Sequence, residues 1–171
     1  MSAPADRPLE AARTSGLVPA GGPLLILLSG GGDSVCLLDV ALRLGARPEA
    51  LHVNYGLRSG ADADERFVRE LCGRLGVPLV VEHVSLSESG GNLQERAREA
   101  RYALAEQHAH GDYAAAHTAS DQAETVLYRL AVSPGSRALH GMAPRRGRLV
   151  RPLLDVTRAE VRDYLRARRL D

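Results

Sequence analysis

The stretch that decides the fold is LLILLSGGGDSVCLLDVALRLG, residues 24–45. An apolar run leads into a serine and three glycines, and a second segment follows in which apolar residues recur at helical spacing. We interpret this as a buried strand over 24–28, a tight turn, and a helix over 33–44 that stops at Gly45. Such a turn aims unpaired backbone N–H groups and the positive end of the helix dipole at one point. The stretch therefore predicts an anion-binding turn, and phosphate is the anion that such turns usually hold.

Six consecutive residues are the candidate phosphate ligands: Ser29, Gly30, Gly31, Gly32, Asp33 and Ser34. Glycine lets the backbone approach an anion closely, and the two serines add hydroxyl donors. A carboxylate beside a phosphate needs a cation between them, so Asp33 is a candidate Mg²⁺ ligand. The alternatives are a turn without a ligand, and an aspartate that simply suits the first turn of a helix.

Working outward, short apolar runs at 50–53, 78–84, 113–116 and 149–150 predict further strands. Helical patterns cover 63–75, 92–108, 120–131 and 157–168, with Asn92 and Thr157 as N-caps and Thr157–Glu160 at capping-box spacing. The alternation predicts an α/β fold: a doubly wound, mostly parallel five-stranded sheet with helices on both faces. Ligands of such sheets bind beyond the carboxyl ends of the strands, where the glycine turn lies.

Composition narrows the classes of protein. All 22 basic residues are arginine, so a lysine-containing phosphate loop and a lysine Schiff base are excluded. Residues 1–22 are rich in Ala, Pro and Gly and predict a flexible leader before a domain over 23–171. No apolar stretch reaches the roughly 18 residues of a membrane span, and no signal-peptide core is visible, so we expect a cytoplasmic protein. The ten arginines after residue 136 form either a phosphate-contacting surface or a solvated helix face.

Five ordered motifs then indicate a family. SGGGDS (29–34) resembles the signature of the PP-loop ATP pyrophosphatases, which cleave ATP to AMP and pyrophosphate. HVNYGLR (52–58), NLQERAREARY (92–102), HTASDQAETVLYRL (117–130) and RPLL (151–154) resemble segments of the tRNA(Ile)-lysidine synthases in the same order. The resemblance runs from about Leu24 to the end of the sequence. It implies a Rossmann-like fold of the adenine nucleotide alpha hydrolase type.

The resemblance also implies a reaction. In that family ATP adenylates the C2 oxygen of the wobble cytidine of an isoleucine tRNA with a CAU anticodon, and free lysine then displaces AMP to form lysidine. ATP and Mg²⁺ would be the cofactors, and tRNA and lysine the partners; a homodimer is compatible with the sequence. Relatives continue into further tRNA-binding domains, so we expect that this chain stops before them.

Residue roles follow by position. The expected catalytic residues are Asp33, Arg98, Arg101, His117 and Asp121, and the expected metal ligands are Asp33 and Asp121. Besides the turn, His52, Val53, Asn54 and His117 would bind ATP, the first three bordering adenine. Alternatives stay open: a structural role for His52, salt bridges of the two arginines with Glu95 and Glu99, and a helix-dipole role for Asp121.

The chain departs from the family pattern at two positions. Thr118 replaces a common histidine, and Ser120 replaces the first of two aspartates, which leaves the number of acidic metal ligands open. Three other functions remain: another ATP pyrophosphatase such as a tRNA thiolation enzyme, a small-molecule amide ligase, and a nucleotide-binding module without catalysis. The two isolated cysteines, Cys36 and Cys72, predict buried thiols and give no cluster-binding pair.

Overall fold

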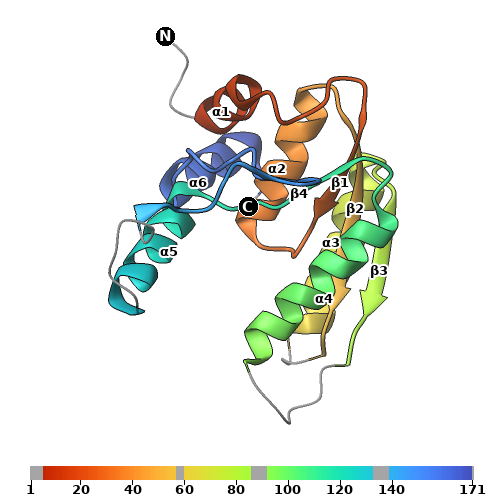
Figure 1. Ribbon diagram of the computed structural model, residues 1–171. Helices are drawn as coiled ribbons and strands as arrows, with labels where there is room; N and C mark the ends of the chain where they lie inside the picture. The colour runs from red at the N-terminus through yellow and green to blue at the C-terminus, as the bar shows by residue number, and fades with distance from the viewer. Residues whose placement is uncertain (1–5, 57–59, 86–91, 133–138, 171) are drawn as a thin grey trace.

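A computed structural model describes residues 6–56, 60–85, 92–132 and 139–170. Within these ranges six strands form one sheet in the order β3-β2-β1-β4-β6-β5. Figure 1 labels the first four of them in the chain, β1 to β4. The strands are β1 (Pro23–Leu27), β2 (Arg47–Asn54), β3 (Leu79–His83), β4 (Asp112–Ala114), β5 (Arg145–Arg146) and β6 (Leu149–Val150). Neighbours pair in parallel except β5 and β6. The predicted doubly wound α/β class is confirmed, with the antiparallel β5 added to the five expected strands.

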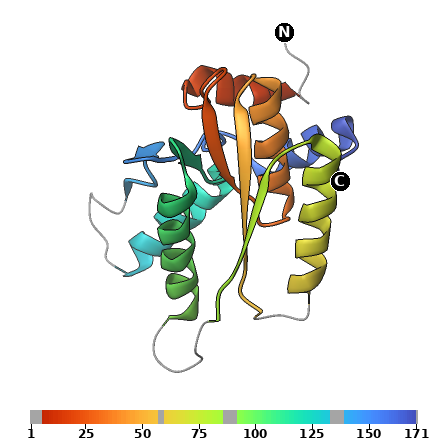
Figure 2. The ribbon, with the colours of Figure 1, turned by 90° about the vertical axis from the view of Figure 1, so that its right-hand side faces the viewer.

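Helices cover both faces of the sheet, as Figure 2 shows for α4 on one side and α2 and α3 on the other. Side chains alternate along β1, so Leu24 and Ile26 pack into one core and Leu25 and Leu27 into another. The first core is shared with α1, α2, α3 and α6, and the second with α4. The helices are α1 (Arg7–Ser15), α2 (Gly32–Arg43), α3 (Ala61–Leu75), α4 (Leu93–His108), α5 (Ala119–Val132) and α6 (Arg158–Arg168).

The prediction of a flexible leader over residues 1–22 is wrong for α1. A proline in the first turn starts this helix, and Gly16 ends it in the left-handed conformation. Leu9, Ala11 and Ala12 are buried in the first core, where α1 packs against α2 and α6. The alanines that looked like leader composition are small residues that let these helices approach closely.

The predicted N-caps of α4 and α6 are confirmed. The side chain of Asn92 accepts a hydrogen bond from the backbone N–H of Gln94 at the start of α4. Thr157 and Glu160 form the expected capping box at the start of α6. None of the helices in the described ranges has the length and apolar character needed to cross a membrane.

The sheet order fixes the position of a ligand site. The chain moves from β1 outward through β2 to β3, and then returns to place β4 on the other side of β1. The direction of winding thus reverses between β1 and β4, and loops leave their carboxyl ends on opposite faces. The glycine turn follows β1, and His117 follows β4, so both border this crevice.

Candidate active site

The glycine turn has the geometry of an anion cradle. Gly30 adopts φ = 89°, a left-handed conformation that favours glycine. Gly31 is the N-cap of α2 and has no side chain with which to cap the helix. The first N–H groups of α2 are therefore left for a ligand. Gly32 is needed for packing, because a Cβ there would lie 3.0 Å from a methyl carbon of Leu165 on α6.

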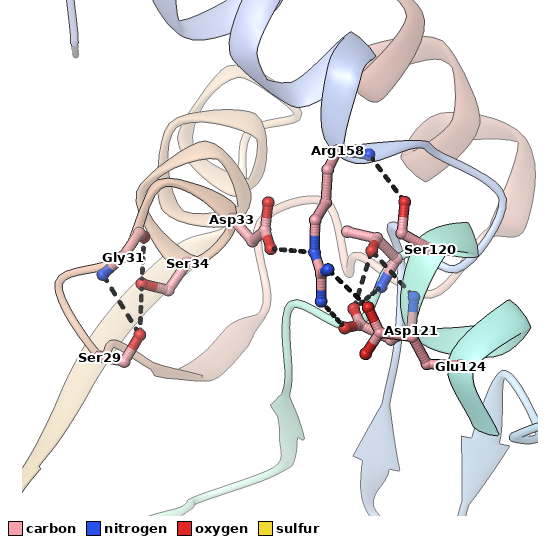
Figure 3. Close-up of polar contacts among 9 residues, drawn as sticks. Ser29, Gly31, Asp33, Ser34, Ser120, Asp121, Glu124 and Arg158 are labelled. Carbon is pink, nitrogen blue, oxygen red and sulfur yellow. Dashed lines mark hydrogen bonds and ion pairs between the residues drawn. The ribbon is translucent and has the colours of Figure 1, made fainter. Parts of the chain in front are cut away.

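The two serines brace the turn (Figure 3). The hydroxyl of Ser34 donates to the carbonyl of Gly31 at 2.8 Å, and the N–H of Gly31 donates to Ser29 Oγ at 3.3 Å. The two hydroxyl oxygens lie 3.2 Å apart. Because Ser34 uses its proton on Gly31, we assign the proton between the serines to Ser29. The turn is thus held in shape by its own side chains.

The two expected metal ligands lie on either side of one arginine. Asp33 stands at the start of α2 and Asp121 in the first turn of α5, and both approach Arg158 of α6 (Figure 3). Burial, with repulsion from Asp121, raises the pKa of Asp33, and two arginines of α6 only partly offset this. Burial alone would raise the pKa of Asp121, but hydrogen bonds from Thr118 and the charge of Arg158 outweigh it and lower that pKa.

This acidic pair fits Mg²⁺. Magnesium is typically held by one or two protein carboxylates, with phosphate oxygens and water completing its coordination. Asp33 lies beside the phosphate turn and Asp121 lines the same cavity of about 230 Å³, so the two could share an ion with a phosphate. Within the described residues no cluster of three or more His, Cys, Asp or Glu side chains could hold a metal by protein ligands alone.

Both departures from the family pattern have structural roles. Thr118 is fully buried, and its backbone N–H and hydroxyl donate to Asp121 Oδ2 at 2.7 and 2.8 Å. Ser120 Oγ accepts from the backbone N–H of Arg158 at 3.3 Å. Thr118 therefore orients the aspartate, and Ser120 joins the start of α5 to the start of α6. Neither residue adds an acidic ligand.

A second cavity, of about 260 Å³, opens beside the turn at the ends of β1 and β2. Ser29 and the three residues expected to border adenine, His52, Val53 and Asn54, line it together. The Nδ1 of His52 lies 2.8 Å from the carbonyl of Leu28, so this ring bridges the two strands. The amide of Asn54 donates to Glu65 at 2.9 Å. Both side chains are thus fixed by protein partners, which favours backbone groups for any contact with a base.

Arg101 of α4 joins the two cavities, since it lines both. Its Nε is buried and has no hydrogen-bond partner in the described part of the chain. A buried charged donor without an acceptor is costly, so this atom points to a ligand that supplies one. Arg98 also lies near the Tyr102 ring, and it lines an adjoining, larger cavity with His117, Asp121 and Glu124. The structure thus brings both arginines to the site, in different cavities.

His117 is held as a neutral ring. Burial, and then the charge of Arg151, lower its pKa to about 4. Arg151 Nε donates to His117 Nδ1 at 3.2 Å, so the ring proton resides on Nε2. The ring also lines the cavity of the glycine turn. His117 can therefore donate a hydrogen bond there at neutral pH without being a cation.

Sequence reasoning missed two arginines of this site, Arg151 and Arg158. Arg151 belongs to the RPLL motif, but the motif does not indicate its role, because its partner His117 lies 34 positions away in the sequence. Arg158 follows the capping threonine of α6, so its place at the start of a helix was visible. The direction of its side chain could not be predicted from the sequence, because its carboxylate partners come from α2 and α5.

These features define a class of protein. It is the α/β nucleotide-binding domains that have a phosphate-binding glycine turn at the switch point of a parallel sheet. Comparison with known proteins gives the family. A model of the PP-loop domain matches residues 11–171, and the chain belongs to the PP-loop family. It is thus an ATP-binding domain of the type that the loop geometry indicates.

The most informative curated relatives are tRNA(Ile)-lysidine synthases. That of Thermus thermophilus is 43% identical in an alignment 154 positions long, which covers 85% of this chain and 30% of the relative. That of Solibacter usitatus is 41% identical over 88% of this chain and 36% of its own, and that of Pseudomonas aeruginosa is 42% identical over 96% and 40%. The chain therefore spans about a third of the length of the curated relatives it matches.

Solved structures share the fold at low sequence identity. A U34-tRNA thiolase, NcsA, from Methanococcus maripaludis matches 97% of this chain and 63% of its own with a TM-score of 0.79 at 16% identity. NMN synthetase from Francisella tularensis matches 100% and 73% with a TM-score of 0.64 at 17% identity. At such identities the likeness shows the fold alone.

Proposed function

We propose that this chain is the ATP-binding catalytic domain of a tRNA(Ile)-lysidine synthase. It would join lysine to C2 of the wobble cytidine of an isoleucine tRNA with a CAU anticodon, and release AMP and pyrophosphate. The observation that carries the proposal is the identity of 41–43% to lysidine synthases over most of the chain. The phosphate turn, the acidic pair and Arg101 line one cavity, which supports it. Such substrates imply a cytoplasmic enzyme.

The phosphate side of the reaction would be served by the glycine turn. Backbone N–H groups at the start of α2 would hold the pyrophosphate portion of ATP, and the Ser29 and Ser34 hydroxyls would turn from their partners within the loop to donate to it. Asp33 and Asp121 would bind Mg²⁺, which neutralises phosphate charge when it is present. The cavity bordered by His52, Val53 and Asn54 would take the adenosine.

The chemistry at the α-phosphate needs donors where negative charge develops. Arg101, whose buried Nε is unpartnered within the described residues, lines both the cavity proposed for adenosine and that of the phosphate turn, and His117 offers a neutral N–H to the latter. Donors fixed in place before the reaction stabilise developing charge without having to reorganise. Arg98 and the hollow around it would face the tRNA base or the amine.

Pyrophosphate release and transfer of labelled lysine test the proposal. We expect both with ATP, Mg²⁺ and a CAU anticodon stem-loop, and neither when the wobble cytidine of that stem-loop is replaced by uridine. Asp33→Asn should lower the rate at least about 100-fold with the fold intact, because one metal ligand is lost. Asp163→Asn removes the same charge from an exposed position on α6 and should leave the rate within about twofold.

The other outcomes separate the competing functions. Pyrophosphate release with deamido-NAD or another small acceptor, but not with the stem-loop, would identify an amide ligase. ATP binding without any release would identify a nucleotide-binding module. Release that is unchanged in Asp33→Asn would contradict the metal role of that residue.

A further inference from the structure

Arg158 makes an unusual set of contacts for a partly exposed arginine. Its Nη1 lies 2.7 Å from Glu124 Oε1, its Nη2 bonds to Asp121 Oδ1, and its Nε lies 3.9 Å from Asp33 Oδ2. Each guanidinium nitrogen thus faces a different carboxylate, and these come from α2 and α5 (Figure 3). A single monovalent cation bridges the two residues that would have to bind Mg²⁺.

The start of α6 holds this arginine in place. The capping box of Thr157 and Glu160 fixes the first turn, and the backbone N–H of Arg158 donates to Ser120. Only the side chain is free to move, and 45% of it is exposed to solvent. Any rearrangement at this point is therefore a swing of the side chain over a fixed helix start.

Asp121 has one oxygen to offer a metal. Its Oδ2 already accepts from the N–H and the hydroxyl of the buried Thr118. The other oxygen, Oδ1, is the partner of Arg158. Mg²⁺ binds carboxylate oxygen at about 2.1 Å and carries a shell of further ligands, so an ion on Oδ1 would need the space of the guanidinium.

We propose that Arg158 competes with the divalent cation for Asp33 and Asp121, and so makes metal binding depend on the nucleotide. A metal alone must displace a cation that is already paired with both carboxylates. ATP changes the balance, because its phosphate oxygens are ligands for the metal and also acceptors for the displaced guanidinium. Arg158 is thus a positioning residue, and the proposal rests on the proposed function only for the identity of the metal site.

Manganese binding provides a test that does not need turnover. Free Mn²⁺ is titrated by electron paramagnetic resonance against wild type, Arg158→Gln and Arg162→Gln, without nucleotide and with a non-hydrolysable ATP analogue. Without nucleotide, we expect Arg158→Gln to bind Mn²⁺ about tenfold more tightly than wild type, because a competing charge has left the carboxylates. With the analogue the difference should shrink to about threefold or less, since the phosphates provide the ligands in both proteins.

Arg162 is the matched control. It lies one turn further along α6 and its charge also lowers the pKa of Asp33, but it makes no ion pair with Asp33, Asp121 or Glu124, all of which are described. Its substitution should change Mn²⁺ affinity by no more than about threefold. An equal gain in Mn²⁺ affinity in both variants would show that Arg158 acts only through its long-range charge, which contradicts direct competition. An unchanged or weaker affinity in Arg158→Gln would overturn the proposal.

A folding control and a second variant complete the Mn²⁺ experiment. Circular dichroism and thermal unfolding establish that Arg158→Gln is folded, and Asp121→Asn should abolish the tight site in the Arg158→Gln background. If Arg158 competes with Mn²⁺ but the protein forms no lysidine, the proposed function is contradicted and this inference is still supported. A protein that forms lysidine but shows no competition between Arg158 and Mn²⁺ would support the proposed function and contradict this inference.

Discussion

His117 shows how one residue links the site to stability. Its pKa in the folded protein, about 4, lies below its ordinary value of 6.5. Between these values the unfolded chain binds a proton that the folded protein does not. The free energy of unfolding therefore rises with pH across this window, and the contribution is complete above about pH 6.5 and lost as the pH falls towards 4. Its full size should be about 3 kcal/mol.

Urea unfolding at pH 4.5 and 7 measures this effect. We expect His117→Gln to flatten the pH dependence by about 2 kcal/mol, because the titrating group is gone. His110→Gln, at an exposed position, controls for the loss of an imidazole. Equal slopes for wild type and His117→Gln would show that Arg151 and burial do not hold this ring neutral.

Residues of the site could be predicted from the sequence where a motif gave both their type and their place in the chain. Ser29, Asp33, His117 and Asp121 each follow a strand or start a helix, and all of them line one cavity. Arg158 could not be predicted, because its partners belong to two other helices and only the packing of α6 brings them together. The pairing of His117 with Arg151 was hidden for the same reason.

At the scale of elements, a buried polar network fixes α6 against α2. The hydroxyl of Tyr164 donates to Asp39 Oδ2, and Arg168 donates to both oxygens of the same carboxylate. Tyr164 and Asp39 are both buried. Since α2 begins at the phosphate turn and α6 begins at Arg158, this network sets the position of Arg158 relative to Asp33.

Removing one hydroxyl tests that interface. Tyr164→Phe should lower the free energy of unfolding by about 2 kcal/mol, because a hydrogen bond to a buried carboxylate is lost while the ring stays packed. Tyr128→Phe, on the exposed face of α5, should change it by less than about 0.5 kcal/mol. Chemical denaturation gives both values, and similar values for the two variants would show that the network contributes nothing at the interface.

Most elements followed from periodicity and capping signals, and the two that were missed have physical explanations. The apolar contacts of α1 rest on one leucine and small alanines, which also occur in unstructured segments. The two residues of β5 are arginines, and they form a strand only because β6 lies beside them at the sheet edge. Tertiary contacts, which a local pattern does not contain, decide both.

At the scale of the whole molecule, α1 completes the core instead of preceding it. Leu9→Ala should lower the free energy of unfolding by about 2–3 kcal/mol, because the side chain is buried against α2 and α6. Leu127→Ala, which removes the same atoms from an exposed position on α5, should cost less than about 0.5 kcal/mol. Thermal unfolding compares the two variants. If Leu9→Ala unfolds like wild type, α1 does not contribute to the core and is a leader, as the composition predicted.

The packing of α2 against α6 joins an early part of the chain to a late one. On a translating ribosome the phosphate turn emerges long before the helix that meets Gly32 through Leu165 and Asp33 through Arg158. Until α6 has left the exit tunnel, α2 can pack against β1, β2 and α1 but lacks its contacts with α6. Nascent chains should consequently complete the nucleotide site only after the last helix has emerged.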